Sequence, residues 1–151
     1  MLNSDLLYQQ ALKYVGISEI DGIDTNPIID DWIKWAMPWV RNEKDLDSRY
    51  AWCAIFLSRM LYEINLLPFN EPIIAARKFI TVGYEVENPK QGDIIILERG
   101  PGKGHIGILD KILPNGKYRL LGGNQQNKVG FNDFDPKRII SKRTVNTNSQ
   151  V

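Results

Sequence analysis

The sequence predicts an α+β fold in which helices come first and strands follow. Apolar residues recur at spacings of three and four in the N-terminal half, which is the period of a helix with one buried face. After Gly83 the pattern changes to short apolar runs bounded by turn residues, which is typical of strands. With 151 residues, 43% hydrophobic and 25% charged, the chain is long enough for one domain with a sizeable core.

We expect that single domain to occupy residues 1–145 and a frayed polar tail to follow at 146–151. The first half should hold four helices. Ser4 is a candidate N-cap for the first, and Asn26 followed by Pro27 suits the start of the second. Their predicted ranges are residues 4–16, 26–38, 52–65 and 73–82.

Four strands are predicted in the second half, at residues 94–97, 106–113, 117–121 and 138–143. Asn115-Gly116 lies between two apolar runs, which is the strongest short-range signal for a hairpin. If these two residues form the turn, Pro114 faces Lys117 and Gly107 faces Asn124. His105 and Asn124 are then diagonal neighbours on one face of the sheet, roughly 7 Å apart in the backbone.

Charge and hydropathy exclude several classes of protein. The chain carries 19 basic and 18 acidic residues, so no strong field draws it to nucleic acid or to anionic membranes. Its apolar runs are far shorter than the ~20 residues that span a bilayer, so we expect no membrane insertion. The N-terminus lacks a secretory signal pattern, and we expect synthesis in the cytoplasm.

Cys53 and His105 are the only cysteine and the only histidine of the chain. Cys53 lies where a polar stretch gives way to a helical apolar pattern, and a helix N-terminus lowers the pKa of a thiol. A neighbouring imidazole would complete the activation as an ion pair, and backbone N–H groups near Cys53 could stabilise an oxyanion. Asn124 is the candidate partner that orients the imidazole. Together these groups predict a cysteine hydrolase.

Other interpretations of the same residues remain open. A lone cysteine in an apolar helix is more often a packing residue, and a lone histidine at a strand start is more often structural. A zinc site would need carboxylates such as Asp93 or Asp110 beside Cys53 and His105. Asp93, which precedes an isoleucine run, is expected to serve a turn, and no cofactor is predicted.

Two further motifs suggest other functions. Gly102-Lys103 resembles part of a phosphate loop, but Gly104 stands where Ser or Thr is required, so the nucleotide interpretation fails. Three tryptophans recur at helical spacing, and such a stripe belongs to a core more often than to a sugar platform. They are Trp32, Trp35 and Trp39.

Five short motifs in one order resemble the CHAP and NlpC-type cysteine peptidase superfamily, over about residues 5–143. An upstream Glu-x-x-Gly-x-x-x-Asn-Pro segment is typical of one CHAP-like group within it. The motifs are Glu19–Pro27, Trp52-Cys53-Ala54, Gly92-Asp93-Ile94-Ile95-Ile96, Gly104-His105-Ile106-Gly107 and Leu121-Gly122-Gly123-Asn124-Gln125.

The resemblance implies a papain-like fold with the nucleophile at a helix N-terminus packed on an antiparallel sheet. It also implies hydrolysis of a peptidoglycan amide, by a stem-peptide endopeptidase or an N-acetylmuramoyl-L-alanine amidase. Carried over, Cys53 is the nucleophile, His105 the general base and then acid, and Asn124 the third member. Gly122 stands where many CHAP domains carry a Glu. Weaker candidates for substrate binding or the oxyanion hole are Glu19, Asn26, Tyr50, Trp52 and Gln125.

Peptidoglycan lies outside the cytoplasm, so the enzyme would reach the periplasm or cell wall by phage-type release or by secretion. A phage lysin and an antibacterial toxin exported by a contractile, type VI secretion apparatus both fit, and a toxin would have a cognate immunity protein. Two alternatives remain. One is a non-catalytic wall-binding or phage structural module of the same fold, and the other is a cysteine hydrolase that acts on a protein.

Overall fold

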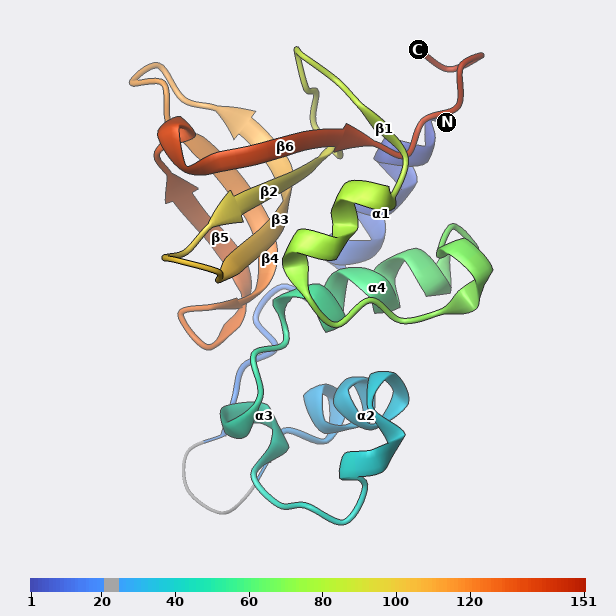
Figure 1. Cartoon of the computed structure of the whole chain (residues 1–151), viewed down its shortest axis with the longest axis vertical. Helices are drawn as coiled ribbons and strands as arrows, with labels where there is room; N and C mark the ends of the chain where they lie inside the picture. Colours follow the sequence, from blue (N-terminus) through green and yellow to red (C-terminus); the bar gives the residue numbers. More distant parts are fainter. Residues whose placement is uncertain (21–24) are drawn as a thin grey trace.

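The strands form one antiparallel sheet, and helices cover one of its faces (Figure 1). A computed structural model describes residues 1–20 and 25–151, and within them the strand order is β1-β6-β2-β3-β4-β5. The predicted α+β class is confirmed. The strands are β1 (Tyr84–Glu85), β2 (Ile94–Glu98), β3 (Gly104–Ile112), β4 (Tyr118–Gln125), β5 (Lys128–Phe134) and β6 (Ile139–Thr144).

Helices α1 and α4 lie against the sheet, whereas α2 and α3 form a lobe beyond α4 (Figure 1). The α-helices are α1 (Asn3–Leu12), α2 (Pro27–Ala36), α3 (Leu46–Arg49) and α4 (Cys53–Glu63). Short 3-10 helices are η1 (Pro38–Val40), η2 (Pro68–Asn70), η3 (Ala76–Thr81) and η4 (Pro136–Arg138). No helix among the described residues is long and apolar enough to cross a membrane.

One predicted helix cap is confirmed and the other is wrong. The Asn26 side chain accepts a hydrogen bond from the Ile28 N–H at the start of α2, as predicted. In α1 the N-cap is Leu2, and Ser4 lies buried inside the helix. The Ser4 N–H donates to Asn146 Oδ1 over 2.8 Å, so the start of the C-terminal tail is held against α1.

The sequence pattern missed one α-helix and two strands, and it predicted the wrong helix type for another element. Helix α3 and strands β1 and β5 have no counterpart among the predicted ranges. The predicted helix at 73–82 is the 3-10 helix η3. Its buried residues, Ala76 and Phe79, are three apart, which is the period of a 3-10 helix.

The predicted register of the β3–β4 hairpin is wrong. The turn has three residues, 114–116, and the Leu113 N–H closes it by donating to the Lys117 carbonyl over 2.8 Å. Gly116 has a φ of +87°, the left-handed conformation that such a turn requires. A further shift between Leu109 and Lys111 brings Ile108 opposite Leu121. Gly107 therefore does not face Asn124.

Strands β2 and β3 are buried on both faces of the sheet over most of their length, since consecutive residues of each are buried. Ile94, Ile96, Ile106 and Ile108 belong to the core beneath the helices. A second, smaller core fills the opposite face and consists of Ile95, Leu97, Leu109, Tyr118, Leu120 and Phe134. Each strand therefore delivers alternate side chains to two different environments.

Candidate functional site

Cys53 is the first residue of α4, directly after the N-cap Trp52. Its side chain is buried, and backbone N–H groups of Cys53, Ala54 and Ile106 hydrogen-bond the sulfur. The bond from Ile106 follows from strand geometry. The Leu109 N–H points to the β2 side, where it donates to Asp93, and N–H directions alternate along a strand. The Ile106 N–H thus points to the β4 side, past the end of the β3–β4 pairing at Ile108.

The hydrogen bond from the Ile106 N–H places the Cys53 sulfur next to the residue that follows His105 in β3. His105 is fully buried in β3, and its ring packs against Phe134 with 5.3 Å between ring centroids. Its Nε2 lies 2.9 Å from Gln125 Oε1. The imidazole partner is therefore Gln125 and not Asn124, the residue expected from the hairpin register.

The orientation of the Gln125 amide fixes the tautomer of His105. Gln125 is buried, and its Nε2 donates to the carbonyls of Leu120 over 3.0 Å and Gly130 over 2.7 Å. With both amide hydrogens used, Oε1 is the atom that faces the imidazole, so His105 Nε2 must carry a proton. The lone pair of the ring then lies on Nδ1. That atom is buried and has no hydrogen-bond partner within the described part of the chain.

Gln125 fills space that Gly122 leaves empty. A Cβ built on Gly122 would lie 2.9 Å from Gln125 Oε1. A side chain at position 122, where many CHAP domains carry a Glu, would therefore compete with the Gln125 amide. Gly122 and Gln125 together explain how the imidazole is oriented without that Glu.

A tight turn after Asn124 brings Gln125 into this position. Asn124 has a φ of +57°, and Gln126 and Asn127 have φ values of +54° and +63°. The β4–β5 register shifts between Gly122 and Gln125, and Gln125 then pairs with Lys128. The run Asn-Gln-Gln-Asn contains asparagine, one of the non-glycine residues that most readily adopt positive φ. That run is the sequence signal from which the turn could have been predicted.

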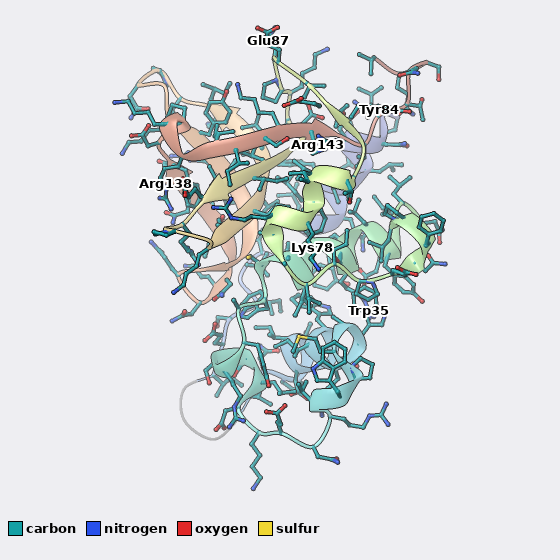
Figure 2. The ribbon with its side chains drawn as sticks, in the orientation of Figure 1. Trp35, Lys78, Tyr84, Glu87, Arg138 and Arg143 are labelled. Carbon is teal, nitrogen blue, oxygen red and sulfur yellow. The ribbon has the colours of Figure 1, made fainter. Side chains whose placement is uncertain are left out.

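Burial shifts the pKa values of both candidate catalytic groups. It raises the pKa of the Cys53 thiol, against the opposing effects of the Arg99 charge and the three N–H groups. Burial also lowers the pKa of His105 to about 4, aided by the charges of Arg99 and Arg138. Arg138 lies near the start of β6 (Figure 2). At neutral pH the raised pKa of the thiol and the lowered pKa of the imidazole both favour the neutral form of each group. The expected ion pair is therefore not the resting state.

A pocket of about 490 Å³ opens at Cys53. One wall is apolar and includes Ile74, Ala75 and Ala76. The charged residues that line the pocket are all cationic: Arg77, Arg99 and Lys103.

The weaker candidate residues make contacts inside the chain. Trp52 is fully buried and its Nε1 donates to Glu19 Oε2 over 2.9 Å. Besides capping α2, Asn26 donates from Nδ2 to the Ser18 carbonyl, and its N–H donates to Asp47. The Tyr50 hydroxyl hydrogen-bonds the Glu43 carboxylate. Residues 21–24 of the upstream segment lie outside the described residues.

The alternative sites gain no support from the geometry. Within residues 1–20 and 25–151, no three His, Cys, Asp or Glu side chains are grouped to hold a metal. Asp93 accepts from the Lys90 N–H over 2.8 Å and serves a turn, as predicted. Asp110 accepts from the Tyr8 hydroxyl.

The tryptophan stripe is divided between the core and the surface. Trp32 is in the core. Trp35, labelled in Figure 2, packs on Tyr62, while Trp39 is 71% exposed. The stripe thus forms no single flat platform.

An α+β domain with a buried cysteine at the start of a helix and a buried histidine on a strand that packs against that helix is the class of protein that these observations define. The family model of the CHAP domain matches residues 45–124, which is more than half of the chain, and the protein belongs to this family. CHAP domains are in general hydrolase domains that act on peptidoglycan. A search of curated proteins found no match. The matched range includes Cys53 and His105 and ends one residue before Gln125.

Proposed function

We propose that this protein hydrolyses an amide bond of peptidoglycan, with Cys53 as the nucleophile and His105 as the general base and then acid. The observation that carries the proposal is the hydrogen bond between His105 Nε2 and Gln125 Oε1. It leaves Nδ1 of the imidazole unprotonated and without a partner among the described residues, next to the strand position that hydrogen-bonds the sulfur. A helix N-terminus packed on an antiparallel sheet also fits a papain-like fold.

Acylation begins from the neutral pair. His105 Nδ1 takes the proton of the Cys53 thiol as the sulfur attacks the carbonyl carbon of the scissile amide. The carbonyl oxygen becomes an oxyanion, which the N–H groups at the start of α4 stabilise. When the C–N bond breaks, Nδ1 returns the proton to the leaving amine, and a thioester on Cys53 remains.

Deacylation repeats these steps with water. His105 Nδ1 takes a proton from a water molecule that attacks the thioester carbonyl, and the C–S bond breaks to release the carboxylic acid. The proton then returns to the sulfur, so the resting thiol and imidazole are restored. Through both half-reactions Gln125 keeps the Nε2–H of the ring in place, the role that the sequence predicts for Asn124.

Two kinds of enzyme share this chemistry, a stem-peptide endopeptidase and an N-acetylmuramoyl-L-alanine amidase. Either would act in the periplasm or the cell wall, delivered as a phage lysin or as an antibacterial toxin through a type VI secretion apparatus. A toxin would have an immunity protein as its partner. These contexts are proposals that rest on the substrate, because peptidoglycan lies outside the cytoplasm.

Mass spectrometry of the muropeptides released from purified peptidoglycan tests the proposal. The wild-type protein should produce fragments with one new amine and one new carboxylate, and their masses identify the bond. Cys53→Ala should release none of these fragments while keeping the circular dichroism spectrum of the wild type. Unchanged hydrolysis by that variant, or no hydrolysis by the wild type, would refute the proposal.

One observation favours the alternative of a non-catalytic wall-binding module. Burial raises the pKa of the Cys53 thiol, whereas cysteine nucleophiles usually have a lowered pKa. The same digestion separates the two functions. An inert module would bind insoluble peptidoglycan in a sedimentation assay and release no fragments.

A further inference from the structure

The loop between β2 and β3 carries two cations at the pocket of Cys53. The Arg99 N–H donates to the Lys103 carbonyl over 2.9 Å, which closes the loop and holds both residues at its base. Both side chains line the pocket. Neither has an ion-pair partner among the described residues. Their charges are therefore available to a ligand.

A third cation, Arg77, supports this loop from η3. Its Nη2 lies 3.4 Å from Glu98 Oε1 and 3.4 Å from the Lys103 carbonyl. Because Glu98 neutralises part of its charge, Arg77 serves chiefly to hold the loop against η3. Arg99 is better placed than Arg77 to contact a ligand at the thiol, since its charge lowers the pKa of both Cys53 and His105.

We infer that this pocket recognises a carboxylate beside the scissile amide, with Arg99 as its principal ligand and Lys103 as a second. The inference rests on the proposed function and narrows its substrate to stem peptides with a free carboxylate next to the cleaved bond. A guanidinium binds a carboxylate through two parallel hydrogen bonds. The apolar wall at Ile74 and Ala75 suits the short alkyl side chain of an adjacent residue.

Two carboxylates of a stem peptide have this chemistry. One is the α-carboxylate of a γ-linked glutamate, and the other is the free carboxylate of a diamino acid at the third position. Either group can be replaced by a primary amide, which has nearly the same shape and no charge. The acid and amide forms of one peptide therefore differ only in the negative charge that the pocket is inferred to recognise.

The test compares two pairs of synthetic muropeptides, one pair for each carboxylate, as acid and as amide. Wild-type kcat/KM should be about ten-fold higher or more for the acid in one of the two pairs, the size expected for a hydrogen bond to a charged group. The pair that shows the preference identifies the carboxylate.

Arg99→Gln should bring that ratio close to one by slowing hydrolysis of the acid. The substitution also removes a charge that lowers the thiol pKa, but this effect slows both forms alike and cancels in the ratio. Arg41→Gln, which changes an exposed arginine outside the pocket, should leave the ratio unchanged.

The outcomes separate the inference from the proposed function. Hydrolysis of acid and amide at equal rates in both pairs would overturn the inference and leave the amide hydrolase intact. A preference that survives in Arg99→Gln would also overturn it. Hydrolysis of peptidoglycan but of none of the four peptides would overturn the inference alone. Failure to hydrolyse peptidoglycan as well as the four peptides would overturn both.

Discussion

His105 and Gln125 are joined by a 2.9 Å hydrogen bond between imidazole Nε2 and amide Oε1, in the interior of the sheet. The imidazole must be the donor in this bond, because Gln125 uses both amide hydrogens on the carbonyls of Leu120 and Gly130. A glutamine held in this way acts only as an acceptor toward the ring. It therefore selects the one neutral tautomer of His105 in which Nδ1 can act as a base.

Replacing Gln125 should cost more activity than replacing Asn124. Gln125→Met keeps the length of the side chain but loses the acceptor, and we expect kcat to fall at least about ten-fold because the imidazole loses its fixed tautomer. Asn124→Gly removes the amide while tolerating the φ of +57°, and should change kcat less than about three-fold. The measurement is kcat at a temperature where both variants are folded, together with its pH profile. A larger loss in Asn124→Gly would return the orienting role to Asn124.

Acid should destabilise the protein through His105. Its pKa is about 4 in the folded protein against 6.5 in the unfolded chain, so below pH 6.5 the unfolded state takes up the proton first. The free energy of unfolding is thus fully preserved above pH 6.5 and falls as the pH drops to about 4, by roughly 3 kcal/mol.

Urea denaturation of the wild type and of His105→Gln between pH 4 and 7.5 measures this contribution. Subtracting one curve from the other removes the contribution of the carboxylates to the free energy of unfolding. This includes Asp93, whose raised pKa changes stability in the opposite direction. A difference that does not change with pH would contradict the lowered pKa of His105.

Gly123 should tolerate no side chain. A Cβ at this position would lie 2.7 Å from the Phe56 Cβ and 2.9 Å from the Trp52 ring, so α4 would have to move away from β4. We expect Gly123→Ala to lower the free energy of unfolding by about 1–3 kcal/mol. Gly130→Ala is the matched control, because its Cβ would meet only the Lys128 side chain, at 3.5 Å or more. Equal effects in thermal denaturation would show that the close approach of α4 is not needed.

Alkylation of Cys53 should be slow at neutral pH. Burial raises the thiol pKa above its ordinary value of about 8.5, and Arg99 opposes this rise. The iodoacetamide rate should therefore increase only in alkaline solution, and Arg99→Gln should move its midpoint to still higher pH. A midpoint below 8 in the wild type would mean that the thiol and imidazole rest as an ion pair.

The sequence predicted the periodic parts of the fold and named two candidate catalytic residues, but it did not show how these side chains are held. Apolar spacing placed α2 and most of β2 and β3, because a helical apolar period and short apolar runs between turn residues are the main sequence signals of a helix and a strand. The predicted hairpin register is wrong because Pro114 joins Asn115 and Gly116 in a three-residue turn, and a second shift follows near Lys111. Both shifts arise from backbone conformation that the apolar pattern does not report.

The sequence indicates only a weak role for Gln125, for the same reason. Its role depends on the positive φ of Asn124 and on the empty space at Gly122, neither of which a strand pattern shows. Cys53 and His105 stand out as candidates in the sequence because each is the only residue of its type. Their neutral resting state depends on burial, which becomes known only when the sheet and α4 are packed together.

Nitrogen NMR of the imidazole tests the central claim most directly, because His105 is the only histidine and its ring signals need no assignment. A long-range ¹H–¹⁵N spectrum of uniformly labelled protein at pH 7 should show a protonated Nε2 and an unprotonated Nδ1. The same pattern should persist on acidification until the ring titrates near pH 4. A proton on Nδ1, or titration near 6.5, would contradict the account of His105 as a base held by Gln125.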